Sequence, residues 1–516
     1  MIRLNLVVQI CLERMVTPVW TVRALSTMSR MSSTEQLEVK PFESIPGPGG
    51  LHQWPLIGSL LNYKPFTRFT PETLHNFLNH MHDKYGPVVK LRLGSQVVVV
   101  CDPKDFETVY RSEGMYPKRT SFDLITAYNK RNNVEPGLSQ LQGEGWHALR
   151  SPINKRLMKV DSAAHYLQQH NQVADDLVQI LATQNLSPEE VQKLFFRFSA
   201  ESLAVVVFNK RLDLLEENPD KEALEFLKLS ETVMSMIQKA LFGKSIAHRW
   251  FRNSTYLKYE AAQNVVRRIA ISRITQEKVK FEQMKTSGQF KEDHSNLLFS
   301  LLSETNLTIE NVSNVMISLY FGGTESTSKY IPVFLYNLAK NPDKQNILRK
   351  EILNCMGQDD PLTTKALSQM PYLKAALKES FRLSFPSAVT SFRILPVDVV
   401  LGGYHVPAGV SIFMFGQRAT RTHFENPDQY LPERWLRSDD KTLRDPAHSM
   451  IVLPFSYGPR NCIGQRFAMQ LLYLAAVKIL QRLDVRIHQD SVNGSFIYKP
   501  FIQARSPIGF KFTGVR

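Results

Sequence analysis

One cysteine in a glycine-punctuated loop near the C-terminus constrains this chain more than any other feature. Residues 455–464 read FSYGPRNCIG, and an apolar helical run from Phe467 to Leu483 follows them. A cysteine before a helix is stabilised as a thiolate by free backbone N–H groups and the helix dipole, and Arg460 adds a nearby cation. The loop therefore predicts that Cys462 is a thiolate ligand to a metal. Taken alone, the segment would also suit an inert buried cysteine.

All five fixed positions of the pattern Phe-x-x-Gly-x-Arg-x-Cys-x-Gly are filled, so this loop resembles the haem-binding loop of cytochrome P-450 monooxygenases. These positions are Phe455, Gly458, Arg460, Cys462 and Gly464. The resemblance implies haem b as the cofactor, with Cys462 as the axial thiolate that favours O–O cleavage. Glycine without a Cβ would let the backbone pass close to the flat ring.

A second resemblance concerns a set of charged residues. Glu379 and Arg382 are three residues apart in a stretch with helical apolar periodicity, and an exposed ion pair would explain that spacing equally well. Residues 432–435 resemble the family's Pro-Glu-Arg-Phe element, with Trp435 in place of Phe. The resemblance implies that Arg434 joins Glu379 and Arg382 in a buried structural triad, because buried charges are tolerated when they are paired.

Residues for the haem carboxylates are also implied. Trp146 and Arg150 are four residues apart, hence on one helical face, and both side chains can donate hydrogen bonds to an anion. In the family this pair meets a haem propionate, and Arg393 and Arg460 stand where further propionate partners are expected. A surface aromatic–cation pair is the alternative for Trp146 and Arg150.

A long helix is predicted to begin near Thr308, which offers an N-cap, and to run toward residue 341. Its interior contains GGTEST at 322–327, although each interior glycine costs about 1 kcal/mol relative to alanine. In the family, the glycine opens a groove for dioxygen and an acid–alcohol pair moves protons. The catalytic residues implied are Gly323, Glu325 and Ser326, where Ser replaces the commoner Thr. A notch for helix packing is the alternative.

Length and composition suit one large domain. The chain has 516 residues, 43% of them apolar, and no Gly/Ser-rich or Pro-rich linker separates its motifs. Helical patterns dominate, and two hairpins are predicted: 88–93 with 97–101, and 398–401 with 410–415. We expect a mainly α fold with a small β lobe (α+β), a single two-lobed cytochrome P-450 domain over residues 51–516. Four widely spaced cysteines do not indicate a disulfide framework.

The N-terminal region predicts the compartment. Residues 1–34 hold four arginines, one glutamate and a Ser/Thr-rich end, which is typical of a mitochondrial transit peptide. Their apolar run is too short to span a bilayer. Residues 35–50 are predicted to be a Pro-rich hinge. The expected location is the matrix side of the mitochondrial inner membrane, with peripheral membrane contact through residues 236–252, which mix apolar, aromatic and basic side chains.

The charge of the chain predicts an acidic partner. The formal net charge is +15, and removing residues 1–34 leaves about +12, which attracts acidic proteins and anionic membranes. In mitochondrial members of the family, lysines matching Lys374 and Lys378 dock an adrenodoxin-like ferredoxin, which an NADPH-dependent reductase serves; Arg466 matches another basic position. Residues 113–119 also resemble a motif of that clan. No dense basic run with aromatics or binding-module signature indicates nucleic acid.

These features predict a haem-thiolate monooxygenase that uses O₂ and ferredoxin electrons to hydroxylate a lipophilic substrate, with a sterol or steroid as first choice. By resemblance, the pocket would be formed by residues 122–128, 319–324, 388–392 and Phe501. Three alternatives stay open: a haem-thiolate isomerase or dehydratase that needs no external electrons, a mitochondrial oxidase of foreign compounds, and a non-enzymatic haem or lipid carrier.

Overall fold

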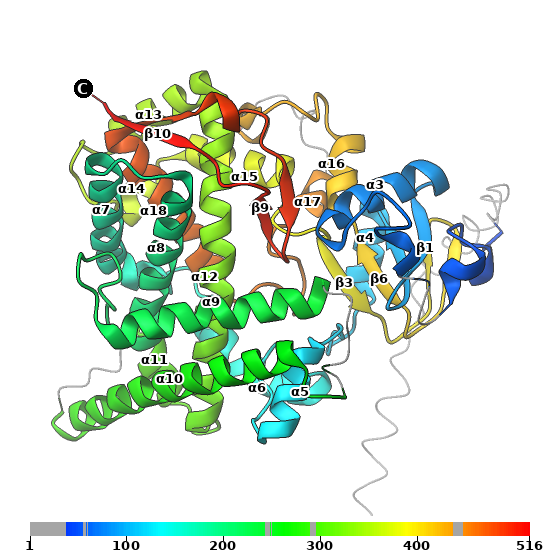
Figure 1. The fold of residues 1–516 in the computed structure, drawn as a ribbon, viewed down its shortest axis with the longest axis horizontal. Helices are drawn as coiled ribbons and strands as arrows, with labels where there is room; N and C mark the ends of the chain where they lie inside the picture. The colour runs from blue at the N-terminus through cyan, green and yellow to red at the C-terminus, as the bar shows by residue number, and fades with distance from the viewer. Residues whose placement is uncertain are drawn as a thin grey trace, which may run out of the picture.

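The computed structural model describes residues 38–54, 58, 60–242, 248, 250–288, 296–436 and 447–515. A large helical lobe forms one side of the molecule and a small β-rich lobe the other (Figure 1). This arrangement confirms the expected mainly α fold with a minor sheet. The predicted transit peptide and Cys11 lie outside the described residues. None of the helices described is long and apolar enough to cross a membrane.

Helices account for most of the described chain. Their bounds are α3 Leu74–Tyr85, α4 Pro103–Arg111, α5 Asp123–Asn132, α6 Gly143–Leu157, α7 Leu167–Thr183, α8 Pro188–Phe208, α9 Lys221–Phe242, α10 Ser254–Thr286, α11 Leu297–Leu302, α12 Ile309–Lys340, α13 Pro342–Cys355, α14 Thr364–Ser368, α15 Pro371–Leu383, α16 Gly416–His423, α17 Ala447–Ile451 and α18 Gln465–Arg482. Several begin with proline at the first helical position, where a missing N–H costs nothing.

The predicted long helix is α12, which crosses the middle of the helical lobe (Figure 1). Thr308 caps it, because its hydroxyl oxygen accepts from the Asn311 backbone N–H at 3.0 Å. Pro332 lies inside the helix. Residues 312–320 belong to one buried apolar cluster, which they share with α6, α8 and α10, and residues 330–338 to another, shared with α15 and α18. The GGTEST segment therefore lies where two halves of the core meet.

Within the described residues, the strands form one four-stranded sheet and three short pairs. Their bounds are β1 Val88–Leu93, β2 Ser95–Val100, β3 Ser391–Ile394, β4 Val399–Leu401, β5 Tyr404–Val406, β6 Ser411–Met414, β7 Leu483–Ile487, β8 Phe496–Tyr498, β9 Ile502–Ala504 and β10 Phe510–Gly514. The order of the main sheet is β1-β2-β6-β3. β2 is antiparallel to β1 and parallel to β6, and β3 is antiparallel to β6.

The first predicted hairpin is confirmed by β1 and β2, but the pairing predicted for the second is wrong. β4 pairs with β5 across Gly402 and Gly403 instead of with 410–415. Both glycines have positive φ, 52° and 83°, which favours a tight turn directly after β4. β6 is then free to join the main sheet beside β2. The hinge remains a prediction; its residue Pro46 accepts a hydrogen bond from the Lys90 N–H of β1 at 2.8 Å.

Candidate active site

The cysteine loop is closed by its own backbone. The Cys462 N–H donates to the Phe455 carbonyl at 2.8 Å, and the Phe455 ring contacts Phe381 of α15 edge-on at 5.9 Å. Gly464 is the N-cap of helix α18, which begins at Gln465, three residues after Cys462. The fold therefore presents the Cys462 thiol beside a helix N-terminus, as the sequence predicts, and the aromatic contact fixes the loop to α15.

Two effects act on the Cys462 thiol in opposite directions. Burial raises its pKa, whereas a hydrogen bond from the Gly464 backbone and the charges of Arg150 and Arg119 lower it. The side chain nevertheless has solvent-accessible surface. The thiol is thus surrounded by protein atoms and yet still accessible. That environment suits a metal ligand better than an inert core cysteine. Cys101 and Cys355 are also free, so no disulfide joins the cysteines in the described chain.

Arg150 and Arg460 converge on this loop from opposite sides. Arg150 on α6 donates to the Asn461 carbonyl at 2.8 Å and to the Asn461 side chain at 3.0 Å. Arg460 donates to the Pro117 carbonyl at 3.0 Å and lies 4.6 Å from the Trp146 ring centre. Burial is the main cause of the lowered pKa values, about 10 for Arg150 and about 9 for Arg460.

Arg393, a predicted propionate partner, has an acidic partner within the chain. It pairs with Glu113, and both side chains are only 3% exposed. Gly458 makes this pair possible: its φ is +81°, and a Cβ there would lie 1.9 Å from Glu113 Oε1. Gly458 thus gives space to a carboxylate of this chain, not only to a ligand. Gly464, by contrast, has open space where a Cβ would be.

The cations of this site outnumber its acids. After burial, the charges of Arg119, Arg393 and Arg150 lower the pKa of Arg460, and Glu113 is the acid that raises it. The Nε atoms of Arg150 and Arg460 and the Oε1 of Glu113 are buried without a partner among the described residues. Buried cations require opposite charge. A ligand with two carboxylates beside Cys462, such as haem b, would supply that charge, so these residues fit the group.

The proposed proton-handling residues lie on one stretch of α12. Ser326 donates to the Gly322 carbonyl one turn earlier, at 2.7 Å. Glu325 is buried and accepts from Gln238 of α9 at 2.9 Å. Burial raises the pKa of Glu325, while Lys329 and the Gln238 hydrogen bond lower it. No sequence pattern points to Gln238, because its partner is 87 residues away along the chain.

The two adjacent glycines of α12 have different surroundings. A Cβ at Gly323 would lie 2.9 Å from Leu203 Cδ1 of α8, whereas a Cβ at Gly322 would meet no atom within 4 Å. Gly323 therefore allows the close packing of α12 on α8, and its part in a dioxygen groove stays a prediction. Gly322 is the residue that borders open space.

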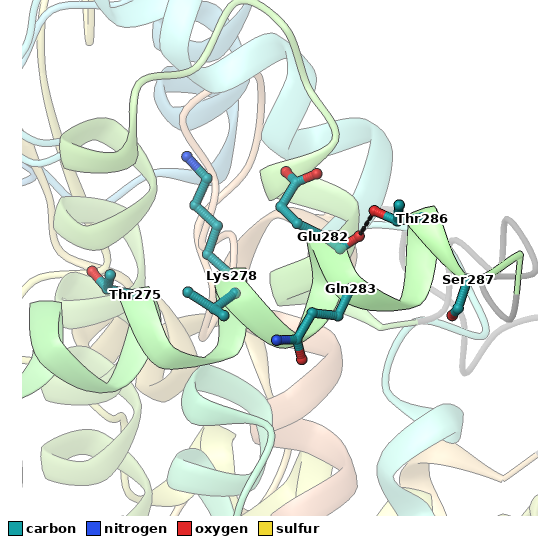
Figure 2. Close-up of a pocket in the computed structure, with 7 residues that line it drawn as sticks. Thr275, Lys278, Glu282, Gln283, Thr286 and Ser287 are labelled. Atoms are coloured by element: carbon teal, nitrogen blue, oxygen red, sulfur yellow. Dashed lines mark hydrogen bonds between the residues drawn. The ribbon is translucent and has the colours of Figure 1, made fainter.

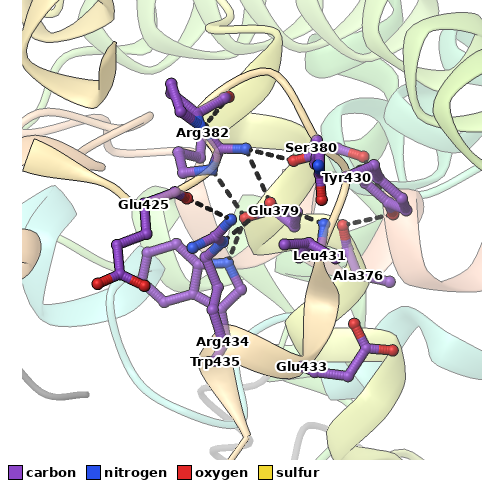
Figure 3. Close-up of polar contacts among 12 residues, drawn as sticks. Ala376, Glu379, Ser380, Arg382, Glu425, Tyr430, Leu431, Glu433, Arg434 and Trp435 are labelled. Atoms are coloured by element: carbon purple, nitrogen blue, oxygen red, sulfur yellow. Dashed lines mark hydrogen bonds and ion pairs between the residues drawn. The ribbon is translucent and has the colours of Figure 1, made fainter. Parts of the chain in front are cut away.

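The structure brings the three triad residues together (Figure 3). Glu379 is fully buried and pairs with Arg382 at 2.8 Å and with Arg434 at 3.1 Å. Trp435 adds a contact that the resemblance does not imply, because its Nε1–H donates to Glu379 Oε2 at 2.8 Å. The Leu431 backbone N–H donates to the same carboxylate at 2.9 Å. Glu379 thus holds α15 to the segment around residue 434.

The predicted docking residues are exposed. Lys374 and Lys378 lie on α15, and Arg466 lies in the first turn of α18. The two lysines differ in their contacts. Lys374 Nζ donates to the Ser368 carbonyl at 3.3 Å, whereas Lys378 Nζ lies 4.1 Å from the centre of the Trp435 ring. Partial burial lowers the pKa of Lys378, although the residue as a whole keeps exposed surface.

Some residues of the predicted pocket segments are bonded into the scaffold, whereas others remain candidates for the pocket lining. Tyr128 is buried and donates to Asn264 at 2.7 Å, and the Thr390 hydroxyl accepts from the Gly416 N–H at 2.9 Å, so both serve the scaffold. Phe122, Leu319 and Phe501 are only half-buried and remain candidates. A separate open hollow of about 760 Å³ lies along α10, lined by residues 275–287 (Figure 2). None of the predicted site residues lines it, so it has no part in the site.

Part of the predicted membrane patch lies outside the described residues, namely 243–247 and 249. Of the described part, Leu241 is 42% exposed and Trp250 63% exposed, and Phe251 beside them is 70% exposed. His248 is buried. The patch thus exposes apolar side chains, which is the property expected of a surface that contacts a bilayer.

Comparison with known proteins agrees with this geometry. The family model described as cytochrome P-450 matches residues 48–512. The chain is 29% identical to the mitochondrial 1,25-dihydroxyvitamin D(3) 24-hydroxylase of Mus musculus, over 87% of this chain and 85% of the relative. It is 28% identical to the probable mitochondrial cytochrome P-450 12a5 of Drosophila melanogaster, over 93% and 92%, and 28% identical to cytochrome P-450 10 of Lymnaea stagnalis, over 90% and 85%.

Proposed function

We propose, because this chain belongs to the cytochrome P-450 family, that it is a mitochondrial monooxygenase which hydroxylates a lipophilic substrate with electrons from a ferredoxin. Haem b is the cofactor of that family, and the chain is an enzyme of it. The observation that carries the proposal is the set of four arginines within or around the Cys462 loop, which a dicarboxylate cofactor would neutralise.

The residues that would hold the cofactor have distinct tasks. Cys462 would ligate the iron, and Arg150 and Arg460 would bind the carboxylates through their unpartnered Nε atoms. Trp146 holds the Arg460 guanidinium by its ring, and Glu113 orients Arg393. When bound, haem b supplies dioxygen activation, in which one oxygen atom enters a C–H bond and the other becomes water at the expense of two electrons and two protons.

Protons would reach the site through α12. Glu325 is held at one oxygen by Gln238 and has its pKa raised by burial, so it can gain and lose a proton nearer to neutral pH than an exposed glutamate can. The Ser326 hydroxyl donates to the Gly322 carbonyl and can rotate to donate elsewhere. We assign proton storage to the Glu325 carboxyl and proton donation to the Ser326 Oγ.

The relatives support the compartment and the partner. Two of the relatives above have names that describe them as mitochondrial, and mitochondrial monooxygenases of this type receive electrons from a ferredoxin and its NADPH-dependent reductase. The proposal places the enzyme peripherally on the matrix side of the inner membrane. A sterol or steroid is the proposed substrate, since one relative is named as a hydroxylase of 1,25-dihydroxyvitamin D(3). Oxidation of foreign compounds is the second candidate.

The thiolate assignment can be tested by spectroscopy. Cys462→Ser should abolish the reduced-CO absorption band of thiolate-ligated haem, because a serine hydroxyl does not replace the thiolate. Cys355→Ser is the matched control: Cys355 Sγ hydrogen-bonds to the Gln369 carbonyl at 3.4 Å and lies far from the predicted iron ligand in sequence, so its replacement should leave the band unchanged. A band that persists in the Cys462 variant would show that another residue ligates the iron.

Turnover separates the alternatives. The wild-type protein should convert a sterol substrate only with NADPH, ferredoxin and reductase present, and should consume O₂. Conversion without electrons would identify an isomerase or dehydratase, and haem binding without conversion of any tested compound would identify a carrier. Sterols and foreign compounds can first be screened by the spectral shift that they cause in the bound haem.

A further inference from the structure

A second cavity lies in the β-rich lobe, apart from the site described above. Its volume is about 440 Å³, within the range of small-ligand pockets. Three segments line it: residues 48–52, residues 62–69 and the face of α3 from Phe77 to Tyr85. In Figure 1 this region lies at the end of the molecule opposite the helical lobe, where α3 covers β1. None of the predicted haem or docking residues contributes to it.

The lining of this cavity is basic and aromatic. It contains Arg68, Lys84, His52 and His80, and no Asp or Glu is among its described lining residues. The acid next to Lys84 in sequence, Asp83, is paired instead with Arg418 at 2.6 Å. No ion pair in the described chain joins Arg68 or Lys84 to a carboxylate. The cavity therefore has a positive potential that its own acids do not cancel, and an anion would be attracted to it.

Aromatic rings hold the two permanent cations. The Arg68 guanidinium lies 5.1 Å from the centre of the Phe69 ring, and Lys84 Nζ lies 5.1 Å from the centre of the Tyr85 ring. Phe69 packs in turn on His80 and Phe77, each at 5.6 Å. Such contacts restrict long basic side chains without neutralising them, so both charges remain available to a bound anion.

The same short segments expose large apolar side chains to solvent. Phe66, which lines the cavity, is 65% exposed. Leu51, Trp54 and Leu60, on the neighbouring turns, are 56%, 55% and 45% exposed. A water-soluble phosphate compound would gain nothing from these side chains. A molecule with an anionic head and apolar chains would bury them while its head enters the cavity.

We propose that this cavity binds the phosphate headgroup of an anionic phospholipid, with Arg68 and Lys84 as its cations and Phe66 against the acyl chains. The inference rests on the peripheral membrane association proposed above and assigns it a second contact, distinct from residues 236–252. Headgroup binding here would orient the β-rich lobe toward the lipid surface.

Vesicle binding tests the inference. The mature chain, loaded with haem, is sedimented with vesicles of phosphatidylcholine alone and of phosphatidylcholine mixed with phosphatidylglycerol. Each basic residue near an anionic surface contributes roughly fivefold to binding, so Arg68→Gln with Lys84→Gln should weaken binding to the mixed vesicles roughly 30-fold. Binding to phosphatidylcholine alone should stay unchanged. Arg68→Lys with Lys84→Arg keeps the charge and should retain most of the affinity.

The matched control is Lys350→Gln with Lys365→Gln, two exposed lysines on α13 and α14. An equal loss in this control would mean that overall charge alone is sensed and would overturn the site. If the Arg68/Lys84 variant lost binding equally on both kinds of vesicle, or lost none, the site would also be overturned. If millimolar inorganic phosphate displaced the protein from the mixed vesicles, the ligand would be a soluble phosphate and the lipid site would be overturned as well. Wild-type protein that binds no vesicle would refute the membrane association itself and the site with it.

Discussion

At the scale of single residues, the carboxylate of Glu379 shows how this chain holds a charge inside its core. Two arginines, one indole N–H and one backbone N–H surround it. Buried charges of this kind are stable only while every partner is in place. Trp435 is the unusual member, because the family pattern has Phe there. The resemblance could predict the arginines, but not a hydrogen bond that depends on which ring occupies position 435.

Trp435→Phe should lower the free energy of unfolding by about 1–2 kcal/mol, since it removes one hydrogen bond to a buried carboxylate but keeps a ring on Phe424 and Lys378. Chemical denaturation of the haem-loaded protein measures this change. Trp250→Phe, at a position 63% exposed, removes an indole N–H from the surface and should change the stability by less than about 0.5 kcal/mol. Equal effects of the two substitutions would contradict the role given to the Trp435 N–H.

Asp105 on α4 makes the free energy of unfolding depend on pH. Its Oδ1 accepts from the Gly402 N–H at 3.0 Å, while its Oδ2 is buried without a partner in the described chain. Burial, with a smaller effect of Asp102, raises its pKa to about 6. The folded state then binds more protons than the unfolded state between about pH 4 and pH 6. This residue therefore weakens the fold as the pH rises through that window.

Asp105→Asn should accordingly stabilise the protein by about 1–2 kcal/mol near pH 8 and have little effect near pH 4, because the amide cannot ionise. Denaturation at the two pH values measures the difference. Asp102→Asn serves as the control: Asp102 caps α4 through the Lys104 N–H at 2.8 Å, and Asn caps equally well. A gain for Asp105→Asn that is the same at both pH values would exclude ionisation as its cause.

At the scale of elements, α12 combines a packing surface and a reactive surface within one turn. Gly323 faces Leu203 of α8 and Gly322 faces open space, although the two are adjacent and chemically identical. The sequence could indicate that a helix with two interior glycines has a special site. It could not indicate which glycine faces the neighbouring helix, because that depends on how α8 and α12 are rotated against each other.

The two glycines should respond oppositely to alanine. Gly322→Ala meets no atom and should stabilise the helix by about 0.5–1 kcal/mol, while lowering turnover because the methyl group fills space next to Ser326. Gly323→Ala presses on Leu203 and should be neutral or destabilising by up to about 2 kcal/mol. Thermal unfolding and turnover of both variants check this. Higher stability for Gly323→Ala than for Gly322→Ala would contradict the described packing.

At the scale of the whole molecule, the sequence predicted local features well and non-local ones poorly. The cysteine loop, the long helix, its Thr308 cap and the first hairpin each depend on neighbouring residues and were recognisable. The pairing of β6 with β2, the Glu113–Arg393 contact and the Gln238–Glu325 contact join distant segments. Periodic patterns of apolar residues predict local structure, and they do not predict contacts between distant segments. Arg119 belongs to the 113–119 motif, but only the fold places it near Arg393 and Cys462.

The positive charge of the whole chain bears on electron transfer. Lys374→Glu with Lys378→Glu should slow reduction by ferredoxin at least about tenfold at low salt, because an attractive surface becomes repulsive to an acidic partner. The difference from wild type should shrink as salt screens it. Stopped-flow reduction measures the rate while the haem content stays constant. Lys258→Glu with Lys278→Glu on α10 makes the same charge change elsewhere; an equal slowing there would remove the docking assignment from α15.

The parallel pairing of β6 with β2 has a consequence for how the polypeptide matures. Val97 lies beside Ser411, so 314 further residues must be synthesised after Val97 before β6 can pair with β2. Until then the β1–β2 hairpin carries a bare edge, and such edges invite association with other chains. A newly made copy of this enzyme should therefore depend on a chaperone that shields that hairpin during its synthesis or translocation.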